Sequence, residues 1–99
     1  MQKTYVLDAN VLLQAPYALE SFEDNHIVLP LAVLEELDDR KGADGEAGNN
    51  ARHVLRFLER LRLQGDLVKG VTLPSGGTVR LEVNHVDAAL PQGLSLIHI

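Results

Sequence analysis

Two acidic residues, Asp8 and Glu36, stand where an α/β protein places groups that do chemistry. Asp8 ends the short apolar segment Thr4–Leu7, in which Val6 and Leu7 are adjacent. A segment that is apolar on both faces is typical of a central strand in a parallel sheet. Open α/β sheets bind their ligands at the carboxyl ends of such strands, where a carboxylate without a role would be costly. Asp8 is therefore the first candidate site residue.

Glu36 lies in the segment that follows a second predicted strand. Residues 26–30 have the strand pattern and end in a proline, which cannot donate to a ladder. Residues 31–41 are predicted to form a helix, with apolar residues at three- and four-residue spacing and Gly42 as a stop signal. A right-handed crossover brings the carboxyl ends of the two strands together, so Glu36 can approach Asp8.

Two converging carboxylates suit a hard divalent cation such as Mg²⁺ or Mn²⁺, which can position a phosphodiester. On the predicted helix, Glu36 borders the apolar stripe, whereas Glu35 and Asp39 point more toward solvent. The alternative is structural: Asp8 caps a helix, and Glu36 belongs to a solvated acidic face. The spacing alone leaves both interpretations open.

The other segments place these residues in an α/β fold with a parallel sheet. Asn10 is a candidate N-cap for a short first turn, and residues 16–22 are predicted to be helical, with proline at the first position. Residues 42–50 are read as a polar, glycine-rich loop before a longer helix. After it, alternating apolar residues on either side of residues 74–77 indicate a β-hairpin over residues 71–83.

Composition narrows the class of protein. The 99 residues are enough for one domain, and 45% hydrophobic with 23% charged residues is normal for a soluble globular protein. The chain has no cysteine, which excludes thiolate metal sites and agrees with a reducing cytoplasm. We expect no secretory signal and no membrane span. The formal net charge of −5 argues against a generally basic nucleic-acid-binding face and leaves room for a local basic stripe.

Several segments together resemble a known family. The opening segment, residues 5–12 (YVLDANVL), is similar to the first motif of PIN-domain nucleases. Residues 29–30 (LP), 33–38 (VLEELD) and 48–52 (GNNAR) are similar, more specifically, to the PIN module that precedes a PhoH-type ATPase. The resemblance runs from about residue 3 to about residue 94, and the combination is more specific than any one segment.

This resemblance implies a three-layer, Rossmann-like fold and an activity. In the family, the first acid and the helix glutamate are metal ligands, which carries over onto Asp8 and Glu36 as catalytic residues. Asn10 would support the first acid from the second shell, and Arg52, within the matched segment, could contact RNA. The implied reaction is cleavage of single-stranded RNA by an endoribonuclease that uses Mg²⁺ or Mn²⁺ to activate water.

The chain also departs from the family pattern. PIN sites are completed by further aspartates on a later strand–helix unit, and the sequence stops before it. Asp87 has no matching context, so we do not assign it to the site. Two carboxylates alone should hold Mg²⁺ weakly, because this ion demands near-octahedral oxygen geometry. No Gly-x-x-x-x-Gly-Lys-[Ser/Thr] motif is present, so ATP would be bound only by a missing ATPase domain in cis.

The last residues suggest a truncated gene. We expect residues 1–93 to be a partial PIN domain and residues 94–99 (LSLIHI) to be a read-through tail, because this hexamer matches the translation of a sequencing adapter. The alternative is a short C-terminal strand. In the family's 3-2-1-4-5 strand order, losing strands four and five leaves strand one at an edge. An exposed central strand is an aggregation hazard, so the chain alone should be marginal or insoluble and inactive.

Other functions stay open. The missing acids favour a non-catalytic RNA-binding or regulatory module of the ATPase. A haloacid-dehalogenase-type phosphatase ranks lower, because its second acid would stand where Asn10 does. A stand-alone toxin fits the PhoH-like motifs poorly. Arg56 and Arg60 could contact RNA phosphates, but the favoured interpretation is a solvated helix face partly paired with Glu59. Phe57 is interpreted as a core residue rather than a base-stacking platform. A cytoplasmic location is expected, and a homo-oligomer is left open.

Overall fold

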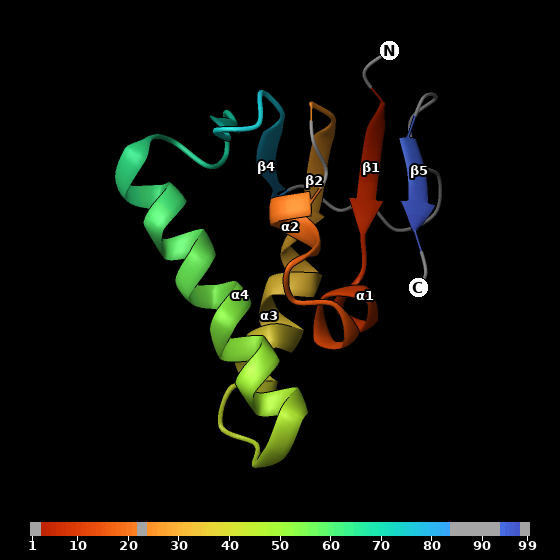
Figure 1. Cartoon of the computed structure of the whole chain (residues 1–99), viewed down its shortest axis with the longest axis vertical. Coiled ribbons are helices and arrows are strands. Elements are labelled where there is room, and N and C mark those ends of the chain that lie inside the picture. The colour runs from red at the N-terminus through yellow and green to blue at the C-terminus, as the bar shows by residue number, and fades with distance from the viewer. Residues whose placement is uncertain (1–2, 22–23, 84–93, 98–99) are drawn as a thin grey trace.

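The computed structural model describes residues 3–21 and 24–83, together with the backbone of residues 94–97. Strands and helices alternate through most of this part of the chain (Figure 1). The elements are β1 (Thr4–Leu7), α1 (Ala9–Gln14), α2 (Ala18–Ser21), β2 (His26–Pro30), α3 (Leu31–Arg40), α4 (Gly45–Gln64), β3 (Val71–Thr72), β4 (Thr78–Glu82) and β5 (Leu94–Ile97).

The five strands form one mostly parallel sheet in the order β3-β4-β2-β1-β5. β1 pairs in parallel with β2, and β2 pairs in parallel with β4. Only β3 runs antiparallel, in the hairpin with β4. The α/β class and the mainly parallel sheet are therefore confirmed, as is the hairpin predicted after residue 70.

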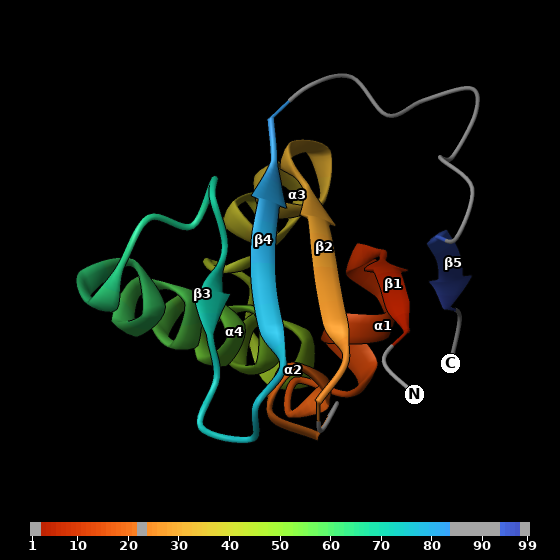
Figure 2. The ribbon, with the colours of Figure 1, turned by 90° about the horizontal axis from the view of Figure 1, so that it is seen from above.

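The helices α1 to α4 lie together on one side of the sheet (Figures 1 and 2). The crossovers from β1 to β2 and from β2 to β4 step across the sheet in the same direction, so right-handed connections put their helices on the same face. The described part thus contains two layers of the three that the resemblance implies.

One hydrophobic core fills the space between the helices and the sheet. Its strand residues face the helices, and its helix residues come from α1, α2, α3 and α4. The fully buried members are Leu7, Val11, Leu12, Leu19, Ile27, Leu29, Leu37, Ala51, Val54 and Val79. Val6 and Val28, which are paired across β1 and β2, are also buried but do not belong to this cluster. Burial of both strand faces accounts for the continuous apolar runs in the sequence.

The predicted loop over residues 42–50 is wrong from residue 45 onward, because α4 begins at Gly45. Glycine and asparagine have low intrinsic helix propensity, which is the basis of the loop prediction. Tertiary contacts override it: Gly48 is buried, and the Asn50 side chain donates to the Leu13 carbonyl oxygen at 2.7 Å. α3 ends at Arg40, within one residue of the predicted end.

The expected edge position of β1 is also wrong. Residues 94–97 form β5, which pairs in parallel with β1 in the register Thr4 to Leu94 and Leu7 to Ile97. β1 is therefore an interior strand, flanked by β2 and β5. The segment read as a tail occupies the position of a short C-terminal strand, and its non-native origin stays a prediction that the flanking genomic sequence can test.

Candidate functional site

Asp8 lies directly after β1, at the carboxyl end of the parallel strands, and its side chain is half-buried. It is the N-cap of α1: one carboxylate oxygen, Oδ1, accepts a hydrogen bond from the backbone N–H of Val11 at 2.9 Å. The predicted N-cap, Asn10, is instead an exposed residue inside the first turn. The helix starts two residues earlier than expected, because β1 ends at Leu7 and Asp8 already has the extended backbone of a cap.

This cap confirms the structural role of Asp8 that the sequence left open. The cap bond occupies one acceptor position of the Asp8 carboxylate, and an ionised carboxyl group has about four on its two oxygens. Capping fixes the side-chain direction relative to α1. Asp8 is thus a pre-oriented acidic group at the edge of the sheet where α/β proteins bind their ligands.

Glu36 lies in α3, the helix that follows β2. Its side chain is exposed, as are those of Glu35 and Asp39, so the expected contrast between these three acids is absent. The next residue, Leu37, is fully buried and fixes which face of α3 meets the core. α3 packs against α1, and the strands that precede these two helices are neighbours. The fold therefore brings together the elements that carry Asp8 and Glu36.

Arg52 is held by hydrogen bonds inside the protein. Its guanidinium donates to the Lys41 carbonyl oxygen and to the Asn49 side-chain oxygen, with a longer bond to the Ala43 carbonyl at 3.4 Å. These contacts tie the start of α4 to the end of the preceding connection. A role in contacting RNA stays a prediction for this residue.

The segment 48–52 is explained by packing. A Cβ atom on Gly48 would collide with the carbonyl group of Ala43, so only glycine fits there. Asn50 bridges α4 to the end of α1, and Ala51 is fully buried. Asn50 was not singled out from the sequence. A polar residue on the buried side of a helix needs a hydrogen-bond partner, and this requirement is the sequence signal that could have indicated the role of Asn50.

Comparison with known proteins gives the family. A model of the PIN domain family matches residues 5–95, which is nearly the whole chain. The chain belongs to the PIN domain family. The match extends through all the described helices and both acidic candidates of this PIN domain.

Its relatives are proteins named PhoH2. The chain is 53% identical over 85 residues to Protein PhoH2 of Bacillus subtilis (strain 168), covering 86% of this chain and 19% of that protein. It is 43% identical over 94 residues to Protein PhoH2 of Thermobispora bispora, covering 93% and 21%. For Protein PhoH2 of Mycolicibacterium smegmatis the identity is 40% over 94 residues, covering 92% and 21%. The chain thus spans about a fifth of the length of these relatives. No solved structure matches it significantly.

Within the described residues of this PIN domain, no group of three or more histidine, aspartate or glutamate side chains is placed to hold a metal ion. Asp87 lies outside the described residues. The acidic candidates therefore remain the pair Asp8 and Glu36. None of the helices described for the PIN domain has both the length and the apolar character needed to cross a membrane.

Proposed function

We propose that this PIN domain is the endoribonuclease module of a PhoH2-like protein, acting on single-stranded RNA with a PhoH-type ATPase domain in cis. The observation that carries the proposal is the position of Asp8. It is an acid oriented by a helix cap at the carboxyl end of an inner parallel strand, beside the helix that bears Glu36, in a chain of the PIN family.

The donor set suits a hard divalent cation. Asp8 and Glu36 supply carboxylate oxygens, which Mg²⁺ and Mn²⁺ prefer, and Mg²⁺ commonly uses one or two carboxylates while keeping several waters. Such a cation, when bound, lowers the pKa of water and so supplies a nucleophile at neutral pH. Further acids would have to come from the part of the protein beyond these residues.

The chain's own residues contribute positioning. The cap bond from Val11 restricts the Asp8 side chain, and the buried residues Leu7 and Leu12 on either side of it hold β1 and α1 in place. Glu36 stands on the exposed side of α3, where a phosphodiester of RNA can reach it. Asn10, exposed in the first turn of α1, is proposed to support Asp8 by a polar contact formed in the loaded site.

Cleavage by the full-length protein tests the site. A fluorescent single-stranded oligoribonucleotide is incubated with Mn²⁺ or Mg²⁺, and the wild type is compared with Asp8→Asn and Glu36→Gln. Glu35→Gln is the matched control, because Glu35 is an equally exposed neighbour on the same helix. We expect cleavage to fall by at least about a hundredfold in the first two variants and to change by less than about twofold in the control, since loss of a ligand costs metal affinity and charge stabilisation together.

Metal binding gives a readout that does not depend on activity. Titration of Mn²⁺ followed by calorimetry should show weaker binding in Asp8→Asn and Glu36→Gln than in Glu35→Gln. Cleavage that survives Asp8→Asn would sink the assignment of the site.

A non-catalytic RNA-binding or regulatory module of the ATPase is the second candidate. It is favoured by the observation that the described residues contain no group of three or more acidic or histidine side chains placed to hold a metal ion. The two functions separate in the same assay. A regulatory module predicts RNA binding without metal-dependent cleavage, and ATPase activity that changes when the PIN domain is removed. In either case we expect the protein to work in the cytoplasm, where its RNA and ATP are found.

A further inference from the structure

Arg56 and Arg60, on the exposed side of α4, have no acidic partner among the residues that the structure describes. Glu59, expected to pair with the stripe of Arg56 and Arg60, instead binds Arg62, with Oε2 accepting from Nε at 3.0 Å. The hydrogen bond from Arg62 lowers the pKa of Glu59, and the same bond raises the pKa of Arg62. Within residues 3–21 and 24–83, no carboxylate forms an ion pair with Arg56 or Arg60.

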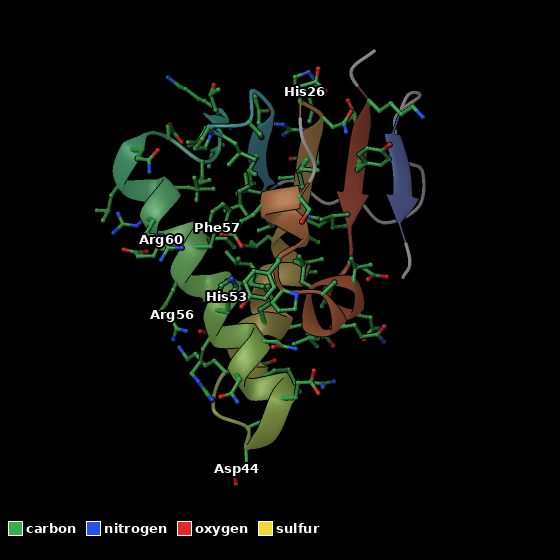
Figure 3. The ribbon with its side chains drawn as sticks, viewed as in Figure 1. His26, Asp44, His53, Arg56, Phe57 and Arg60 are labelled. Carbon is green, nitrogen blue, oxygen red and sulfur yellow. The ribbon has the colours of Figure 1, made fainter. Side chains whose placement is uncertain are left out.

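These arginines lie on one stripe of the helix with an imidazole. His53, Arg56, Phe57 and Arg60 follow one another along α4 at i, i+3, i+4 and i+7 (Figure 3). At a rise of about 1.5 Å per residue the stripe is about 10 Å long. The Arg60 guanidinium lies over the Phe57 ring, 5.7 Å from its centroid, and Phe57 itself packs against the core. The cation–π contact therefore holds Arg60 on the surface of a fixed ring.

An exposed aromatic ring continues the stripe. Tyr17, with 62% of its surface exposed, lies against His53 with ring centroids 4.4 Å apart. His53 also contacts the Glu20 carboxylate, with 3.4 Å between Nε2 and Oε2. Tyr17 further lines a surface hollow of about 530 Å³, which is large enough for a nucleobase. Its polar lining residues are Gln14, Ser21, Glu46 and Asn50, so a base can find polar partners there, whereas the Glu46 carboxylate keeps the phosphates on the arginines.

We infer that Tyr17, Arg56 and Arg60 form a track for single-stranded RNA along α4, with the phosphates on the arginines and a base on the tyrosine. Guanidinium groups that have no ion pair within the described residues lie along the same helix as His53, which contacts the exposed Tyr17 ring. Cationic groups combined with an exposed aromatic ring bind single strands without sequence preference. The formal net charge of −5 means that most of the remaining surface repels a polyanion. A local cationic stripe is therefore the part of the surface where RNA is expected to bind. The length of the stripe corresponds to roughly three stacked nucleotides at ~3.4 Å each.

This track rests on the proposed RNA-directed function for the identity of the polyanion, but it is distinct from the acids at the strand ends. Binding is therefore measured without cleavage, by fluorescence anisotropy of a labelled ten-nucleotide oligouridylate with the full-length protein in EDTA. The double variant Arg56→Gln, Arg60→Gln is compared with the control Arg40→Gln, Lys69→Gln. The control removes the same charge from two exposed cations that have no ion-pair partner in the described residues.

We expect the stripe variant to bind at least about tenfold more weakly, and its slope of log K against log salt to fall by about 1.4, because each lost phosphate contact on a single strand contributes about 0.7. Tyr17→Leu should weaken binding by about tenfold while leaving the salt slope unchanged, since stacking involves no ion release. The control should stay within about twofold of the wild type. Circular dichroism melting of every variant shows that the fold is kept.

Equal losses in the stripe and control variants would overturn the inference, because binding would then reflect net charge alone. An unchanged affinity in the stripe variant would overturn it as well. The two proposals fail separately: RNA that binds through this track but is not cut refutes the nuclease, whereas RNA that is cut in an Asp8-dependent way and bound equally by the stripe variant refutes the track.

Discussion

Asp8 has a structural task and a proposed chemical one, and two substitutions separate them. Asparagine can accept the same cap hydrogen bond from Val11 through its side-chain oxygen but carries no charge. Alanine removes both the acceptor and the charge. We therefore expect Asp8→Asn and Asp8→Ala to be equally poor at metal-dependent cleavage and to differ in stability.

The size of the difference follows from the cap. Losing an N-cap acceptor to alanine costs about 1 kcal/mol. A negative charge near a helix N-terminus contributes about 0.3–1 kcal/mol, and the lower end applies here because α1 has only 6 residues. Asp8→Asn should thus cost about 0.3 kcal/mol and Asp8→Ala about 1.3 kcal/mol. For a domain of this size these free energies correspond to melting temperatures lower by about 1–2 °C and about 5–10 °C.

Thermal and urea unfolding of the PIN domain within the full-length protein, in EDTA, measures the cap alone. Adding Mn²⁺ to the full-length protein then measures the ligand: a metal at a hundred times its Kd stabilises the site by about 2.7 kcal/mol, and both variants should lose that gain. If Asp8→Asn destabilises the metal-free protein as much as Asp8→Ala does, the cap hydrogen bond is not the source of the carboxylate's contribution to stability. If Asp8→Asn keeps the full Mn²⁺-dependent shift, Asp8 is not a ligand.

Three further predictions concern the scaffold. Gly48→Ala should cost about 1–3 kcal/mol in urea unfolding because its Cβ meets the Ala43 carbonyl, whereas Gly42→Ala, which has open space around it, should be neutral or slightly stabilising. Asn50→Ala should cost about 1–2 kcal/mol, since the Leu13 carbonyl oxygen loses its donor; an unchanged unfolding midpoint would contradict this. Deleting residues 94–99 from the 99-residue chain should increase its self-association in size-exclusion chromatography, because β1 then becomes an edge. Monodisperse monomers with sharp, equal melting transitions would refute the last prediction.

Local patterns were enough to predict most of the fold. The doubly apolar strand before Asp8, the strand ending in Pro30 and the hairpin after residue 70 all appear in the structure, because each depends on neighbouring residues. The two wrong predictions concern features that depend on residues far away in the sequence. The early start of α4 needs the partners of Gly48 and Asn50 in other segments, and the interior position of β1 needs residues 94–97.

For the candidate site, too, the sequence predicts some features and misses others. A strand end predicts where Asp8 stands, and the crossover rule predicts that α3 lies nearby. Sequence spacing does not predict that Asp8 rather than Asn10 is the cap, since both residue types cap helices well. Nor does it predict that Glu59 pairs with Arg62, because Arg56 and Arg62 each lie three residues from Glu59 along the helix and the spacing does not choose between them.

The cap and the proposed metal ligand are linked through side-chain order. A carboxylate free to rotate must lose that freedom when it binds a cation, and outer contacts that orient a ligand commonly raise metal affinity by tenfold or more. In Asp8 the bond from Val11 already fixes one oxygen relative to α1, while the burial of Leu7 and Val11 fixes α1 relative to the sheet. The cap hydrogen bond supports a structural role for Asp8. The same bond would also strengthen a weak site of two carboxylates, because it orients one of the proposed ligands in advance. A variant that loosens α1 without touching the carboxylate, such as Val11→Ala, should accordingly weaken Mn²⁺ binding by the full-length protein even though residue 8 is unchanged.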